Sequence, residues 1–183
     1  MSNTQDTVSK ILFDYIGTSE EMLVDLMSQQ KFKDVIDNMM AKCYDFTIET
    51  GGRAESLGAL ATSILHYLLT RAMIPSQRKA SLDNIEVDVA VPDLGTLKAS
   101  PEKALVIYVP MTLDPNVIRG NLCRLEKIQP EKQNIWTVLA EDLELENKTY
   151  IIAKHGGSFS KIIHDIAQFA NTHGKNRFKI MGA

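Results

Sequence analysis

The spacing of the hydrophobic residues first changes near residue 85, from helical to alternating. Before that point apolar residues recur every three or four positions, and the densest run, Ala54–Met73, has an apolar face wide enough to imply deep burial. The segment Ile85–Val91 instead alternates branched residues with polar or small ones. The first period is that of a helix and the second that of a half-buried strand. The chain is therefore predicted to be a mixed α/β protein with a helical N-terminal part.

The later elements follow from the same two periods and from capping residues. We expect a turn at Pro92–Gly95, then a central strand, a helix capped by Asp114, two further strands, a last helix and an edge strand. In chain order, the elements after the turn are Leu105–Val109, 114–129, Ile135–Leu139, Thr149–Ala153, Ser158–Thr172 and Arg177–Met181. The expected fold is a central mixed sheet of four or five strands flanked by helices. Residues 1–50 would form a helical extension packed on an α/β core of residues 51–183, as one domain overall.

Composition and charge exclude several classes of protein. With 183 residues, 44% hydrophobic and 23% charged, the chain is not a collagen, a coiled coil, a disordered tail or a disulfide scaffold. The net charge of −3 argues against a protein whose main task is to grip a phosphate backbone. Residues 1–49 carry nine acids and four bases, whereas residues 154–183 carry five bases and one acid. The acidic segment suits a basic partner, and the basic segment suits phosphate or an acidic partner.

Neither a secretory signal nor a membrane span is expected. The N-terminus is polar, and no apolar run approaches the roughly 20 residues that span a bilayer. Cys43 and Cys123 are far apart and outside metal-ligand spacing, which indicates reduced thiols and a cytoplasmic location. Both lie in helical apolar stripes, where we expect them to be buried as small hydrophobic residues, and His66 is expected in the core of its helix.

Acidic residues occur in an order that is typical of one enzyme superfamily. Glu55 stands in the first turn of the long helix, Asp88 stands on the following strand, and an apolar strand comes next. This order resembles the core of the PD-(D/E)xK nucleases, which include archaeal Holliday-junction resolvases. In that superfamily a helical Glu, a strand Asp and an acid-x-Lys converge, the carboxylates hold Mg²⁺, and the Lys positions the attacking water. The resemblance covers about residues 51–139, and it implies a restriction-endonuclease-like core with Glu55 and Asp88 as metal ligands.

The third element of the superfamily pattern is missing. Tyr108 stands at the place of the acid, and Pro110 stands at the place of the lysine. Tyrosine is a poor Mg²⁺ ligand and proline carries no charge, so the resemblance implies a nuclease-like protein without catalytic activity or cofactor. Archaeal proteins that interact with the TATA-binding protein are similar in kind. The predicted function is therefore binding of a protein or a nucleic acid, and a homodimer is compatible with it.

Two alternatives remain for the acidic residues. One is a Mg²⁺-dependent DNA nuclease with a migrated active site, in which Glu55, Glu86 and Asp88 hold the metal and a lysine from the following loop replaces the missing one. The other is that Glu86 and Asp88 form only the solvated face of an amphipathic strand, and that Glu55 only favours its helix N-terminus.

A second candidate site is a small-anion or nucleotide site between the last strand and the last helix. Its residues are Lys154, Gly156, Gly157, Ser158 and Lys161. A glycine turn that opens a helix offers free backbone N–H groups to an anion. The segment lacks the spacing of the known nucleotide-binding loops, so the alternative is a tight turn in which Ser158 caps the helix.

Overall fold

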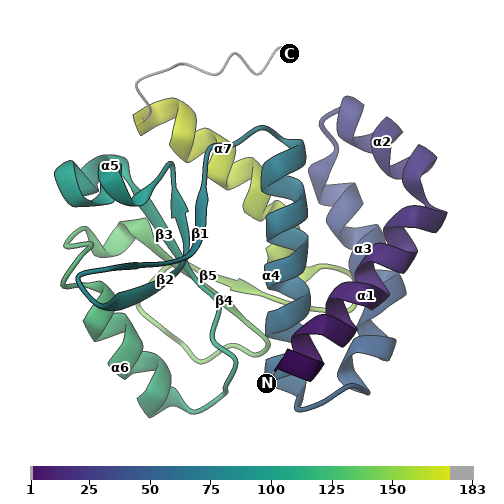
Figure 1. Cartoon of the computed structure of the whole chain (residues 1–183), viewed down its shortest axis with the longest axis horizontal. Helices are drawn as coiled ribbons and strands as arrows, with labels where there is room; N and C mark the ends of the chain where they lie inside the picture. The colour runs from purple at the N-terminus through teal and green to yellow at the C-terminus, as the bar shows by residue number, and fades with distance from the viewer. Residues whose placement is uncertain (1, 174–183) are drawn as a thin grey trace.

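Five strands form one mixed sheet in the order β1-β2-β3-β4-β5 (Figure 1). The computed structural model describes residues 2–173. The three strands β1, β2 and β3 pair antiparallel, whereas β3, β4 and β5 pair parallel. Their bounds are Gln77–Leu82 (β1), Ile85–Val91 (β2), Leu105–Tyr108 (β3), Ile135–Leu139 (β4) and Thr149–Ile151 (β5). The predicted α/β class, with a mixed sheet of four or five strands, is confirmed.

Helices cover both faces of the sheet, and α1–α4 precede its first strand in the chain. The helices are α1 (Ser2–Thr18), α2 (Glu20–Ser28), α3 (Phe32–Ile48), α4 (Arg53–Arg71), α5 (Leu94–Ala99), α6 (Pro115–Leu125) and α7 (Ile162–His173), with 3₁₀ turns at Pro101–Lys103, Lys132–Asn134 and Gly157–Lys161. Asp114 caps α6 as predicted, because its Oδ1 accepts a hydrogen bond from the Asn116 N–H at 2.9 Å. No helix within residues 2–173 has the length and apolar composition needed to cross a membrane.

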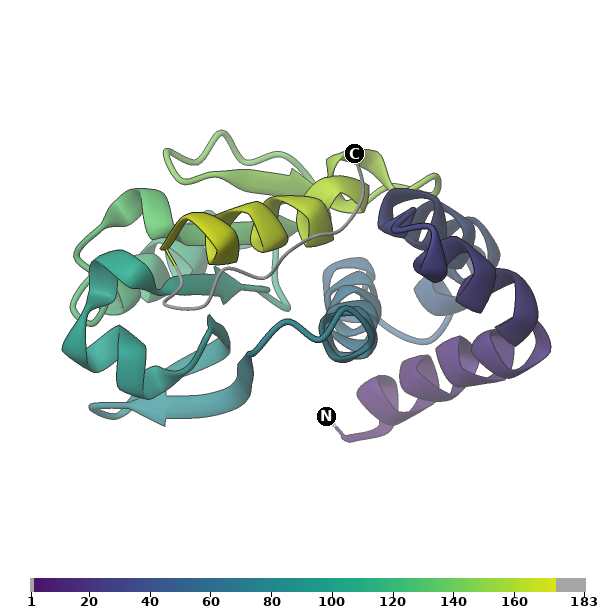
Figure 2. The ribbon, with the colours of Figure 1, turned by 90° about the horizontal axis from the view of Figure 1, so that it is seen from above.

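Two apolar clusters lie on opposite faces of the sheet. The larger cluster joins α1–α4 and α7 to alternate residues of β2, β3 and β4, among them Val89, Ile107 and Trp136. The smaller cluster joins α5 and α6 to the intervening residues, among them Ala90 and Val106. In Figure 1, α5 and α6 lie on one side of the sheet and α4 on the other, and Figure 2 shows α4 between the sheet and α1–α3. Strand alternation thus divides the chain into two layers of helices around one sheet.

The N-terminal helices are joined to α4 by polar contacts as well as by apolar packing. Gln5 Nε2 donates to Ser63 Oγ at 3.1 Å, and Ser9 Oγ lies 3.1 Å from the same hydroxyl. The small side chains of α1 and α4 allow this approach, and both Leu12 and Leu60 are fully buried nearby in the larger cluster. The extension therefore shares its core with the α/β part.

Strand β1 is the principal element that the periodicity analysis missed. It pairs with β2 through a two-residue turn at Asp83 and Asn84, which have φ values of 49° and 62°. Positive φ at both positions is typical of a type I′ hairpin turn, and asparagine and aspartate tolerate it. The strand begins with three exposed residues, Gln77, Arg78 and Lys79, so no apolar alternation marked it in the sequence.

Two further predictions need correction. The segment Pro92–Gly95 is not a simple turn, because Asp93 Oδ1 accepts the Thr96 N–H at 2.6 Å and so caps α5. The last helix begins four residues later than expected, because Gly157–Lys161 forms a 3₁₀ turn. The predicted edge strand Arg177–Met181 lies outside the described residues.

His66 makes the stability of the protein depend on pH. The residue lies in α4, and burial of its ring, together with the positive charges of Arg78 and Lys79, lowers its pKa from 6.5 to about 4. Between these two pH values the unfolded chain binds a proton that the folded chain excludes, so the free energy of unfolding falls as the pH is lowered through this window.

We expect His66→Gln to reduce this loss of stability. Urea unfolding at a series of pH values from 7.5 to about 4.5 measures it, since the free energy of unfolding follows from the transition midpoint and slope. The wild-type protein should lose more stability than the variant over this range. Equal losses in the two proteins would show that His66 does not cause the effect.

Candidate functional site

A small pocket opens at the carboxyl end of β3, between β2 and α6. Its volume is about 90 Å³. The lining residues are Ile85, Glu86, Asp88, Tyr108, Asn121, Arg124 and Leu125. In α/β proteins with open sheets, ligands usually bind beyond the carboxyl ends of the parallel strands, and β3 is the first strand of the parallel part. This position and the polar lining make the pocket the candidate functional site.

Asp88 joins the end of β3 to β2. The pairing of Val89 with Ile107 places Asp88 beside Tyr108, and Asp88 Oδ2 accepts a hydrogen bond from the Val109 N–H at 2.8 Å. The carboxylate thus takes over the role of a backbone acceptor where the β2–β3 ladder ends. Burial raises the pKa of Asp88 above its ordinary value and the negative charge of Glu86 raises it further, while the Val109 hydrogen bond and Lys79 oppose the shift.

Tyr108 forms the wall of the pocket toward β4. Its Oη accepts a hydrogen bond from Asn121 Nδ2 at 2.9 Å, which ties β3 to α6. Burial, and to a smaller extent the charge of Asp88, raises the pKa of this phenol, so it stays protonated near neutral pH. The next residue in the same row of the sheet is Thr137, which pairs with Tyr108 and is fully buried, with no hydrogen-bond partner for its Oγ1 among the described residues. Polar character therefore continues inward from the pocket.

The charged groups of the pocket differ in how far they are exposed. Asp88 is half-buried, whereas Glu86 and Arg124 are exposed at the rim. Within residues 4–173 no ion pair joins Arg124 to either carboxylate. The formal charge of the lining is therefore that of two acids and one base, and the acids are not neutralised by direct contact.

Glu55 does not share this pocket. It lies in the first turn of α4, and α4 packs on the opposite face of the sheet. The structure therefore brings Glu86 and Asp88 together with Tyr108 but separates Glu55 from them. Among the described residues, no three Asp, Glu, His or Cys side chains are placed to hold one metal ion. The three-carboxylate arrangement of the migrated active site is not formed in this part of the chain.

The groups of the predicted anion site are bonded within the protein. Lys154 Nζ pairs with Asp45 Oδ2 on α3 at 2.5 Å, and Ser158 Oγ accepts the Ile151 N–H of β5 at 2.7 Å. Ser158 therefore caps the strand edge rather than the helix. Lys161 stays exposed.

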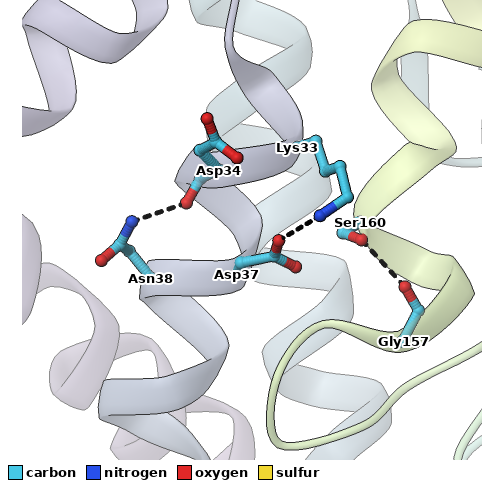
Figure 3. Close-up of polar contacts among 6 residues, drawn as sticks. All are labelled: Lys33, Asp34, Asp37, Asn38, Gly157 and Ser160. Carbon is cyan, nitrogen blue, oxygen red and sulfur yellow. Dashed lines mark hydrogen bonds and ion pairs between the residues drawn. The ribbon is translucent and has the colours of Figure 1, made fainter.

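A carboxylate already faces the glycine turn. Figure 3 shows Asp37 of α3 between Lys33 and the turn that contains Gly157, with Ser160 Oγ donating to the Gly157 carbonyl at 2.8 Å. Asp37 Oδ1 is buried and has no hydrogen-bond partner among the described residues, and a Cβ atom on Gly156 would collide with it. An incoming anion would therefore meet negative charge at this turn, so its geometry suits the contact with α3 better than an anion site.

The two cysteines differ in their accessibility. Cys43 is buried, and burial raises the pKa of its thiol to about 11. Cys123 is exposed on α6, contrary to the prediction from its apolar stripe, one residue from Arg124 at the pocket rim. The chain therefore carries one accessible thiol beside the candidate site.

Asn121 and Arg124 are pocket residues that the sequence analysis did not identify. Both lie on α6 at a spacing of three residues, which places them on one helix face, but the sequence does not show which strand that face meets. Comparison with models of known protein families, with curated protein sequences and with solved structures gives no match. The functional argument therefore depends on the pocket itself.

Proposed function

We propose that this chain is a non-catalytic protein with a nuclease-like order of elements, and that it acts by binding a partner protein. The proposal depends on what Asp88 and Tyr108 do, because they stand at the positions that match catalytic residues of the nucleases. Asp88 accepts the Val109 N–H, and Tyr108, at the place of an acid, is held by Asn121. The residues that would do chemistry in a nuclease instead maintain the shape of a pocket.

The charge of the pocket favours a protein over a nucleic acid as the partner. A phosphate backbone would approach Glu86 and Asp88 at the cost of charge repulsion, and the arginine at the rim is a single opposing charge. The N-terminal helices add to this effect, since residues 1–49 carry nine acids and four bases. A basic surface of another protein complements both regions.

The catalytic alternative is tested by incubating the protein with branched, single-stranded and double-stranded DNA in Mg²⁺ or Mn²⁺. We expect no cleavage above the protein-free control. Fluorescence anisotropy with the same DNA molecules at physiological salt should show no saturable binding. Metal-dependent cleavage that Asp88→Asn abolishes would overturn the proposal in favour of a nuclease, and tight DNA binding would overturn the choice of a protein partner.

The protein partner is tested by photo-crosslinking from the accessible thiol. Cys123 is labelled with a thiol-specific photo-crosslinker, and the labelled protein is irradiated in an extract of the source cells. As a matched control, Cys123→Ser is combined with Gln168→Cys, which moves the label to an exposed position on α7. We expect one protein with a basic surface to be linked from α6 and not from α7. The same products from both positions would indicate non-specific capture and contradict the proposal.

A further inference from the structure

We propose that the pocket between β2, β3 and α6 binds the cationic head of an arginine or lysine side chain from the partner protein. This inference rests on the proposed function, because it identifies the group by which the partner would be recognised. It assigns a binding role to residues that the function proposal uses only for their shape and charge.

The size of the pocket suits a side-chain head rather than a whole small molecule. The pocket volume of about 90 Å³ is several times the roughly 10–15 Å³ that one buried water needs, and it is well below the roughly 300–1,000 Å³ of clefts that hold drug-sized ligands. A planar guanidinium or an ammonium group therefore suits this space better than a nucleotide does. The stem of a long basic side chain would contact the apolar lining residues Ile85 and Leu125.

Several groups in the pocket have free acceptor oxygens, beside the donors of the Tyr108 hydroxyl and the Arg124 guanidinium. Asn121 donates its amide to Tyr108, which leaves the carbonyl oxygen of Asn121 as an acceptor. One oxygen of Asp88 accepts the Val109 N–H, and no donor within residues 4–173 occupies its other oxygen. Glu86, two residues away on the same face of β2, adds a further carboxylate. A guanidinium has five N–H donors and no acceptor, and an ammonium has three donors, so either complements this set.

Electrostatics points to the same ligand class. Burial raises the free energy of the charged form of Asp88, and the negative charge of Glu86 adds to this cost. A bound cation relieves this repulsion, and the half-buried position makes the attraction stronger than at an open surface. Arg124 at the rim opposes the same cation, because it contributes a like charge without an ion pair to either acid.

The test uses Nα-acetyl-arginine methylamide and its lysine analogue as probes of the free protein. Two-dimensional ¹⁵N NMR follows the backbone amide of Val109 and the side-chain amide of Asn121 during the titration. We expect saturable shifts of both signals with the arginine or the lysine probe. The citrulline analogue, which has the shape of arginine without its charge, should cause no saturable shift.

Three variants give the sign of the ligand charge. Asp88→Asn should weaken binding about ten-fold, and Glu86→Gln about two- to five-fold. Arg124→Gln should strengthen binding about two- to five-fold, since it removes a like charge. The matched control is Glu102→Gln, which neutralises an exposed acid outside the pocket and should leave binding unchanged. The reverse pattern with inorganic phosphate as the probe would show that the pocket takes an anion and would overturn the inference.

Failure of this inference and failure of the proposed function are separable. If neither basic probe shifts the two signals, the pocket inference is wrong, while the crosslinking and cleavage experiments still decide the proposed function. If Mg²⁺ alone shifts them at lower concentration than either probe, the pocket is a metal site and the inference is overturned. If a basic probe binds but the crosslinker captures no partner from α6, the pocket assignment stands and the proposed function fails.

Discussion

Phe159→Ala should reduce the free energy of unfolding by about 3–5 kcal/mol, the cost of removing a buried aromatic ring and leaving a cavity. The ring is fully buried in the larger apolar cluster, at the 3₁₀ turn Gly157–Lys161. This turn contacts α3, β5 and α7, so the cavity would form where the N-terminal helices meet the sheet. Urea unfolding followed by far-ultraviolet circular dichroism measures the loss.

The matched control is Phe13→Ala, which removes a ring of the same kind from the surface of α1. Phe13 is 57% exposed, so its replacement should change the free energy of unfolding by less than about 0.5 kcal/mol. Comparable losses in the two variants would contradict the packing role of Phe159. The fluorescence of Trp136, the single tryptophan, should report the same transition as circular dichroism, since the extension and the sheet share one core.

Gly157→Ala should be destabilising by about 2–4 kcal/mol, because a strained backbone conformation and a steric collision act together. Gly157 has a φ of 61°, and a Cβ atom at this position would lie 2.5 Å from the Ile151 carbonyl oxygen. That oxygen belongs to the backbone of β5, so it cannot move aside as a flexible side chain would. The midpoint of urea unfolding measures the effect.

Gly120→Ala is the matched control for the glycine substitution. Gly120 lies inside α6, and nothing is within 4 Å of the position that a Cβ atom would take. Alanine should therefore stabilise the helix, by about 0.5–1 kcal/mol. A loss of stability in Gly157→Ala no greater than about 1 kcal/mol would show that the turn adjusts its backbone and that the tight strand-to-turn contact is not required.

The local sequence pattern was sufficient for the elements that bury many apolar residues. The helix α4 and the strand β2 were predicted because their apolar residues repeat at the spacing of their secondary structure, and β3 and β4 because they are short, largely apolar runs. Strand β1 has an exposed and charged start, and its existence depends on pairing with β2 through the turn at Asp83 and Asn84. Pairing of this kind depends on a partner strand, which periodicity within one segment does not encode.

The candidate site, like the fold, could be predicted only in part from the sequence. Alternation along β2 was enough to place Glu86 and Asp88 on one face, and the sequence also showed Tyr108 where the resemblance requires an acid. Neither pattern could show that α6 covers that face, with Asn121 and Arg124 completing the pocket. The spacing of apolar residues in a helix shows which of its residues are buried, but not which other element of the fold buries them.

By itself, the sequence determined the class of the fold, the acid pair on β2, and the presence of Tyr108 and Pro110 at the end of the apolar strand that follows. Only the tertiary structure decided that Glu55 lies on the other side of the sheet from Asp88, and that Asp37 and Asp45 of α3 face the segment once expected to hold an anion. The physical reason is that the charge of a segment and the spacing of its apolar residues can be read from that segment alone. A site, by contrast, is formed by segments that lie far apart in the chain. Their approach is set by how the two apolar clusters pack against the sheet.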